Sequence, residues 1–215
     1  MKIFKLIVFV VAMLTVHIGY GQSPKFVLPN LNDPADRNNL ERTAKLQVEH
    51  FANCLEKIVD TQTYPSIVER KKFITRALSL FIGEGESFEL LGRMFDGVKI
   101  EITSVSTGKP KPPYYVKNYL KRICDLAEDY YTEVHITTVD VMKCSDIKVL
   151  EDGKYECTIT YSQKFLARRG DGGLTGDVTV KHVKVYLFVK FVPSGVKIIP
   201  KLGDISAGET KKIRK

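Results

Sequence analysis

Three segments of the chain repeat apolar residues every three or four positions, which is the spacing of one face of an α-helix. The first covers residues 36–60, and the preceding Asp33-Pro34 pair favours a helix start there. Its apolar positions are Leu40, Ala44, Val48, Phe51, Leu55 and Ile58. The second segment covers residues 65–83 and the third covers residues 114–130. The pattern predicts three amphipathic helices.

Elsewhere the apolar period changes to two, which is typical of β-strands with one buried face. One such segment, residues 98–105, stands between the second and third helices. Four more follow the third helix, at residues 134–144, 155–168, 178–192 and 196–205. Turn sequences rich in glycine separate them. The order of helices and strands predicts a single α+β domain whose later strands pair antiparallel.

The segment at 178–192 contains one break in its alternation. Val178 and Val180 occupy even positions, whereas Val183, Val185, Leu187, Val189 and Phe191 occupy odd positions. A strand with one buried face changes phase only through an extra residue. We therefore predict a β-bulge near Lys181-His182, which would also curve the sheet.

Five stretches carry a resemblance to a known family. In chain order they are VKIEITSV, YVKNYLKRI, DGKYECTITYSQKF, GDVTVKHVKVYLFVK and KLGDISAGET. Over residues 36–209 they resemble secreted bacterial domains, without assigned activity, of the nuclear transport factor 2 and ketosteroid isomerase superfamily. The resemblance implies an α+β fold, a cone-shaped domain with three helices packed on a strongly bent antiparallel sheet. It also implies a pocket at the open end of the cone.

Eight residues are expected to enclose this pocket, because the first helix and the sheet would direct them inward. They are His50, Phe51, Leu55, Asp140, Ile159, Tyr161, Val185 and Leu187. His50, Asp140 and Tyr161 are the polar anchors, and we expect at least two of them to line one cavity. Each also has a structural explanation, as a helix residue, a solvent-facing strand residue and a core tyrosine respectively.

The sequence leaves three possible functions. A non-enzymatic domain that binds a small apolar ligand or a protein partner is favoured. The alternative is a pocket enzyme, an isomerase, dehydratase or hydrolase, which would present at least two converging polar groups with shifted pKa values. The third is an adhesin that uses Arg169-Gly170-Asp171, although this tripeptide lies in a glycine-rich segment typical of a hairpin turn. No zinc or nucleotide motif is present, so we expect no metal and no cofactor.

The net charge of +8 is concentrated at the chain ends. Removing the six basic residues at positions 2, 5, 211, 212, 214 and 215 leaves 27 basic against 25 acidic residues. A nucleic-acid-binding protein would carry its basic surface on the fold, so we expect no nucleic-acid partner.

The first 21 residues have the composition of a secretory signal peptide. A basic start precedes a short apolar run and small residues at Gly19 and Gly21. We therefore predict a signal peptide at 1–21, a linker at 22–35, the domain at 36–209 and a basic tail at 210–215. The protein would be periplasmic or secreted, with no membrane span after cleavage. An uncleaved N-terminal anchor is the alternative.

Four cysteines allow three complete disulfide pairings, and they are Cys54, Cys124, Cys144 and Cys157. In a regular two-residue hairpin, Cys144 would face Tyr161 and lie roughly 13 Å along the strand from Cys157. That separation excludes a disulfide unless a loop or bulge changes the register. Free buried thiols are the favoured interpretation.

Overall fold

The structure is a computed structural model that describes residues 27–103, 111–151, 153–193 and 195–213. The helices are α1 (Pro34–Val59), α2 (Ile67–Ser79) and α3 (Val116–Asp129), with a 3-10 turn, η1 (Ile82–Gly85), after α2. The shorter strands are β1 (Phe88–Leu90), β2 (Arg93–Phe95), β3 (Lys99–Ile100), β4 (Tyr114–Tyr115), β6 (Lys143–Cys144) and β7 (Lys148–Glu151). The longer strands are β5 (Tyr131–Thr138), β8 (Lys154–Arg169), β9 (Leu174–Val192) and β10 (Gly195–Lys212). The three predicted helices are confirmed.

Helix α1 is the central support of the domain. Asp33 caps its first turn, since the Asp33 carboxylate accepts a hydrogen bond of 2.9 Å from the backbone amide of Ala35. The predicted apolar face is buried from Leu40 to Ile58. Gln47, also buried, donates hydrogen bonds of 3.0 Å to the carbonyls of Leu80 and Pro200. These bonds tie α1 to the end of α2 and to β10.

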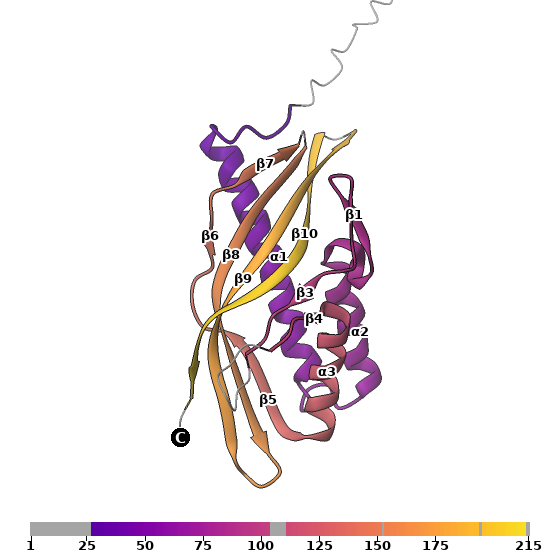
Figure 1. Ribbon diagram of the computed structural model, residues 1–215, viewed down its shortest axis with the longest axis vertical. Helices are drawn as coiled ribbons and strands as arrows, with labels where there is room; N and C mark the ends of the chain where they lie inside the picture. The colour runs from indigo at the N-terminus through magenta and orange to yellow at the C-terminus, as the bar shows by residue number, and fades with distance from the viewer. Residues whose placement is uncertain (1–26, 104–110, 152, 194, 214–215) are drawn as a thin grey trace, which may run out of the picture.

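The main sheet is strongly curled and mixed. Its order is β4-β3-β10-β9-β8-β5, and β6 and β7 pair with β8. All its pairs are antiparallel except β3 with β10, which is parallel. Strands β1 and β2 form a separate hairpin. In Figure 1 the long strands β8, β9 and β10 wrap past α1, with α2 and α3 beside it.

Two predicted strands are shorter or broken in the structure. Of the segment predicted at 98–105, the structure describes residues 98–103, and within these β3 has two residues. The segment at 134–144 is divided into β5 and β6 by a bend at Asp140. The Asp140 carboxylate accepts hydrogen bonds of 2.6 Å from the Ser162 amide and hydroxyl, which hold the bend against β8. The prediction that Asp140 lies within a strand is therefore wrong.

The predicted bulge near Lys181-His182 is also wrong. The β8–β9 pairing is continuous from Lys154 opposite Phe188 to Arg168 opposite Leu174. The register shifts lie instead in β10, between residues 202 and 205 and between residues 207 and 210. A Cβ at Gly203, in the first shift, would approach the Tyr186 ring to 2.7 Å. Curvature thus comes from bulges in β10.

The inner face of β9 keeps one phase from Asp177 to Leu187. Every odd position there is buried, and at Asp177, Thr179 and Lys181 it is polar. The apolar alternation changes in the sequence because the interior becomes polar there. No residue is added to the strand.

Both ends of the described part of the chain contact the fold. Before α1, the Pro29 carbonyl accepts a hydrogen bond of 2.8 Å from the Tyr155 hydroxyl, and Leu31 packs against the core. At the other end β10 continues through Lys212, which pairs with Asp177. Residues 210–212 of the predicted tail are therefore part of a strand. The predicted signal peptide lies outside the described residues, and none of the described helices is long and apolar enough to cross a membrane.

Helices on one side of a curled sheet, with a long first helix along its concave face, make an α+β cone-like fold. The fold class predicted from the sequence is confirmed. The sheet is mixed, whereas an antiparallel sheet was predicted, because β3 and β10 pair parallel.

Candidate functional site

An interior pocket with a volume of about 540 Å³ lies between α3 and the inner faces of β5, β8 and β9. Its walls combine aromatic and aliphatic side chains with a set of polar ones. The apolar and aromatic lining residues are Ile102, Tyr119, Ile123, Leu126, Tyr130, Tyr131, Ile136 and Phe165. The polar lining residues are Thr103, Lys111, Arg122, Gln163, Arg169, Thr175, Asp177, Thr179 and Lys181.

Strand β9 supplies the polar floor of this pocket. Asp177, Thr179 and Lys181 alternate along the strand, so all three side chains point to its inner face. Their exposed fractions are 6%, 4% and 6%. Gln163, which faces Thr179 from β8, is 8% exposed. Four buried polar side chains thus converge from two neighbouring strands.

Hydrogen bonds hold these groups in place. The Thr179 hydroxyl donates to the Asp177 carboxylate at 3.1 Å and lies 3.0 Å from the Thr210 hydroxyl. The Lys181 ammonium donates to the Glu101 carbonyl at 3.1 Å. Lys181 has two further N–H groups, and Asp177 a second oxygen, with which to meet a ligand.

Burial changes the pKa values of both charged groups. It raises the pKa of Asp177, and the Thr179 hydrogen bond and the Lys181 charge oppose that rise. It lowers the pKa of Lys181 from 10.5 to about 8, against the opposing effects of Asp177 and Glu101. The pKa of each group is therefore closer to neutral pH than it is in water, which favours proton exchange with a ligand.

The wall opposite β9 is aromatic. Burial, followed by the charge of Asp177, raises the pKa of Tyr119 to about 12, so its hydroxyl remains a hydrogen-bond donor. The Tyr131 ring meets the Phe165 ring at 6.2 Å and the Tyr130 ring at 4.9 Å, both edge to face. Such a wall favours a flat apolar ligand.

Basic residues surround the mouth. The Arg122 guanidinium lies 5.8 Å from the centre of the Tyr114 ring. Arg169 is half-exposed and forms an ion pair with Asp171 at 3.2 Å. Among the described residues that line the pocket, Lys111, Arg122, Arg169 and Lys181 are basic and Asp177 is acidic.

The residues expected from the sequence to enclose the pocket lie elsewhere. Five of them are packed solidly into the core with at most 1% exposure, and they are Phe51, Leu55, Ile159, Val185 and Leu187. Tyr161 is also buried. Burial, with a further contribution from Tyr119, raises its pKa. These six side chains fill the centre of the cone, and none of them lines the interior pocket.

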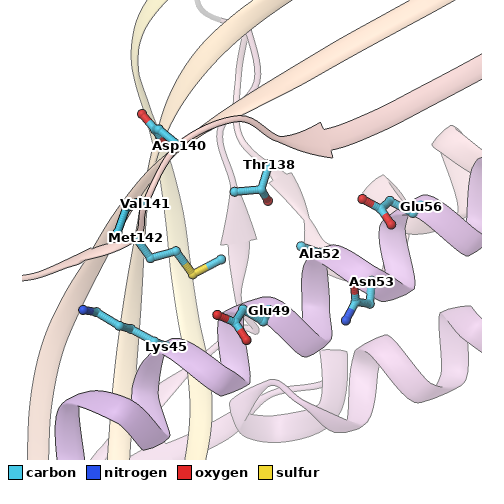
Figure 2. Close-up of a pocket in the computed structure, with 9 residues that line it drawn as sticks. All are labelled: Lys45, Glu49, Ala52, Asn53, Glu56, Thr138, Asp140, Val141 and Met142. Carbon is cyan, nitrogen blue, oxygen red and sulfur yellow. The ribbon is translucent and has the colours of Figure 1, made fainter. Parts of the chain in front are cut away.

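The other two predicted anchors, His50 and Asp140, are exposed. Asp140 lines an outer groove of about 430 Å³ between α1 and the bend after β5. Figure 2 shows this groove, with Lys45 and Glu49 on α1 and the Asp140 carboxylate pointing away from the helix. The Ser162 hydroxyl and amide lower the pKa of Asp140 by their hydrogen bonds. The three expected anchors therefore do not meet in the interior pocket.

The sequence contains a sign of the interior pocket. The break in alternation between Val180 and Val183 marks the point where polar side chains enter the interior. The break predicts a bulge near Lys181-His182, whereas in the structure it reflects the polar side chains of Asp177, Thr179 and Lys181 on the inner face. No sequence pattern located Tyr119 or Gln163.

The Arg-Gly-Asp tripeptide forms the turn between β8 and β9. The Asp171 carboxylate accepts a hydrogen bond of 2.8 Å from the Gly173 amide, and Gly172 has a positive φ of 83°. The same carboxylate pairs with Arg169, so the two charged side chains of the tripeptide face each other. Arg169 also lines the pocket, so the tripeptide contributes one side chain to it.

No group of three or more His, Cys, Asp or Glu side chains among the described residues is arranged to hold a metal ion. The polar groups of the pocket are instead suited to hydrogen bonding, charge pairing and proton exchange with an organic ligand.

Comparisons with known proteins give structural likenesses only. No family model matches the chain, and no curated protein matches it. It is similar to a scytalone dehydratase-like structure from Novosphingobium aromaticivorans, at 8% identity and a TM-score of 0.42, over 84% of this chain and 93% of that one. It is similar to a nuclear transport factor 2-like protein of unknown function from Exiguobacterium sp. 255-15, at 8% identity and a TM-score of 0.34, over 75% and 95%. A third similar structure is assigned as the beta subunit of an aromatic-ring-hydroxylating dioxygenase from N. aromaticivorans, at 12% identity and a TM-score of 0.38, over 81% and 94%. The fold class itself rests on the element order and sheet pairing described above.

Proposed function

We propose that the protein is an exported domain that binds a small organic molecule, with a flat apolar body and an anionic group, in the interior pocket. The observation that carries this proposal is the buried set of Asp177, Thr179 and Lys181 beneath an aromatic wall. Export is supported by the composition of residues 1–21.

The cost of this arrangement supports a role in binding. Burying a charged side chain in an apolar interior is unfavourable unless it is paired. Lys181 is nearly inaccessible to water, and its described hydrogen bond goes to a neutral carbonyl. Groups of this kind in a cavity are concentrated at functional sites.

The charge balance defines the ligand class. Among the described lining residues, Lys111, Arg122 and Lys181 outnumber Asp177 even though Arg169 is paired with Asp171, so the pocket has an excess of positive charge. A carboxylate or sulfonate on the ligand would complement it. The aromatic wall would bury the rest of the ligand, which would be about the size of one or two fused rings.

The test is a fluorescence titration with 8-anilinonaphthalene sulfonate, an aromatic anion. We expect saturable binding to the wild-type protein at one site. Lys181→Met should weaken it about ten- to a hundredfold, because a charge-assisted contact contributes roughly 1.5–3 kcal/mol. Lys190→Met is the matched control, since Lys190 is exposed on the same strand and should leave binding unchanged.

Two results would count against binding in this pocket. One is equal affinity of the wild type and Lys181→Met. The other is probe fluorescence that appears only with loss of near-ultraviolet circular dichroism, because that signature belongs to a loosened core.

Acid–base catalysis is a second candidate, and the opposite pKa shifts of Asp177 and Lys181 favour it. Two converging groups with shifted pKa values are what an isomerase, dehydratase or hydrolase requires. Asp177 would move a proton, and the Tyr119 hydroxyl or the Lys181 ammonium would donate to a developing oxyanion. The measurement is deuterium uptake from solvent at the carbon next to the carbonyl in aromatic ketones. Uptake that Asp177→Asn abolishes without changing probe affinity would establish catalysis, and uptake equal to the protein-free rate would eliminate it for these ketones.

A further inference from the structure

Two cysteines meet on the inner face of the sheet, away from the interior pocket. In β6, Cys144 pairs with Ile159 of β8, whereas a regular hairpin would place it opposite Tyr161. The difference arises in two steps. In β7, Lys148 pairs with β8 one residue out of the hairpin register, and in β6, Cys144 pairs two residues out. The shift brings Cys144 two residues closer to Cys157.

Cys144 and Cys157 then face each other diagonally. Cys157 and Ile159 point to the same face of β8, and Cys144 packs against the core from that side. Interaction between the two thiols is the largest cause of the opposite shifts in their pKa values. The backbone nearby is fixed by the Ser145 amide, which donates to the Thr158 carbonyl at 2.9 Å, and by the Thr158 amide, which donates to the Ser145 hydroxyl at 2.9 Å.

We propose that Cys144 and Cys157 are a redox pair that closes to a reversible disulfide, with Cys144 reacting first and Cys157 completing the bond. The structure holds both as thiols. The inference depends on the proposed export in one respect, because export would bring the protein into a compartment that contains an oxidant. The oxidant is an external disulfide, either glutathione disulfide or a thiol–disulfide oxidoreductase.

The reaction balances in two exchanges. The Cys144 thiolate attacks one sulfur of the external disulfide, which forms a mixed disulfide and releases one thiol. Cys157 then loses its proton and attacks the Cys144 sulfur, which forms the internal disulfide and releases the second thiol. Two protein thiols are oxidised, and one external disulfide is reduced to two thiols.

The environment gives the two cysteines different roles. Cys144 is partly exposed, and interaction with the Cys157 thiol lowers its pKa in spite of burial and of Glu41 and Asp146 nearby. The same interaction, with burial and the Cys144 charge, raises the pKa of Cys157, which is 2% exposed. A thiolate that solvent can reach next to a buried partner is the arrangement of an attacking and a resolving cysteine.

Closing the bond requires β6 to move toward β8, because diagonal cross-strand neighbours lie roughly 7–8 Å apart, whereas the Cα atoms of a disulfide usually lie roughly 4.4–6.8 Å apart. β6 is only two residues long and pairs on one side with β8, so a small displacement of this strand is less costly than one in the long central strands. Closure would fasten the 145–156 segment to the sheet and remove conformational freedom from the unfolded chain.

The other two cysteines provide internal controls. Cys54 on α1 and Cys124 on α3 are buried, and burial raises the pKa of each. Both should stay reduced when the Cys144–Cys157 pair oxidises.

The experiment uses the purified full chain in glutathione buffers of graded oxidised-to-reduced ratio, followed by alkylation, digestion and mass spectrometry. We expect one linked peptide pair containing Cys144 and Cys157, with Cys54 and Cys124 alkylated. Cys157→Ser should stop at a glutathione adduct on Cys144, and Cys144→Ser should carry no adduct on Cys157. Cys54→Ser is the matched control and should behave as the wild type does.

A second measurement needs no variant. On the reduced wild-type protein, iodoacetamide should modify Cys144 at least about tenfold faster than each of the other three cysteines. The oxidised protein should melt about 5–10 °C above the reduced one, as expected for a disulfide that closes a loop of this length. A stable glutathione adduct on wild-type Cys144, a different linked pair, or equal alkylation of all four cysteines would overturn the proposal.

Discussion

Replacing Lys181 with methionine should stabilise the protein while it weakens binding. Methionine has nearly the length of lysine and fits an apolar environment, but it lacks the ammonium group. Lys181 is 6% exposed and donates to the Glu101 carbonyl. The substitution therefore removes a buried charge at the cost of one hydrogen bond.

The size of the effect follows from the pKa of Lys181. Burial lowers it from 10.5 to about 8, and that difference corresponds to about 3 kcal/mol at 1.36 kcal/mol per pH unit. Loss of the hydrogen bond to the Glu101 carbonyl reduces the gain in stability by about 1 kcal/mol. We expect the free energy of unfolding at pH 7 to rise by about 2 kcal/mol, or about 4–8 °C in melting temperature for a domain of this size.

The pH dependence has a definite sign. Between pH 8 and 10.5 the unfolded chain holds the Lys181 proton more tightly than the native protein does, so wild-type stability gains from this residue as pH rises. The penalty is present in full below pH 8 and disappears above 10.5. The advantage of Lys181→Met over the wild type should therefore shrink across this window.

Urea unfolding of both proteins at pH 7, 8.5 and 10 measures this difference, with Lys190→Met as control. Tyrosine titration affects both proteins alike and cancels in the comparison. Equal stability at pH 7, or an advantage that grows between pH 8 and 10.5, would refute the argument that Lys181 is buried in its charged form.

Three further predictions address the sheet, the turn and the N-terminus. Gly176→Ala should destabilise the fold by about 1–3 kcal/mol, because its Cβ would lie 2.6 Å from the Phe165 carbonyl oxygen, whereas Gly170→Ala meets nothing within 4 Å and should be neutral in urea unfolding. Asp171→Glu should leave the melting temperature within about 2 °C of the wild type, since the residue is exposed at a hairpin end; a larger loss would mean that the turn supports the body. Intact-mass analysis of protein from the native envelope should show cleavage after Gly21, and full-length chain in membranes would indicate an anchor instead.

The helices were predictable because each one is amphipathic over several turns. The spacing of apolar residues along α1 depends only on which side meets the core, and the Asp33 cap is a local interaction. The short strands were harder to predict. β3 and β6 have two residues each, and their limits are set by partners far along the chain, β10 and β8.

The site was less accessible than the fold for the same reason. Phe51, Leu55 and Leu187 were expected around a cavity, but they fill the centre of the cone completely. The cavity lies further along the cone, toward the β8–β9 turn, where Asp177 and Lys181 replace the apolar residues of β9. A pattern of apolar positions identifies an inner face and does not distinguish a filled part of it from a hollow one.

The sequence by itself determined the α+β class, the three helices and the long paired strands, because hydrophobic periodicity records which side of each element is buried. Tertiary structure alone decided where the interior is hollow and which polar side chains meet there, since both depend on how α3 and the curled sheet approach each other. It also decided that Cys144 lies near Cys157, because a register shift in a two-residue strand does not change the spacing of apolar residues in the sequence. Apolar burial is a property of each element and is encoded locally, whereas a site is a property of the distances between elements.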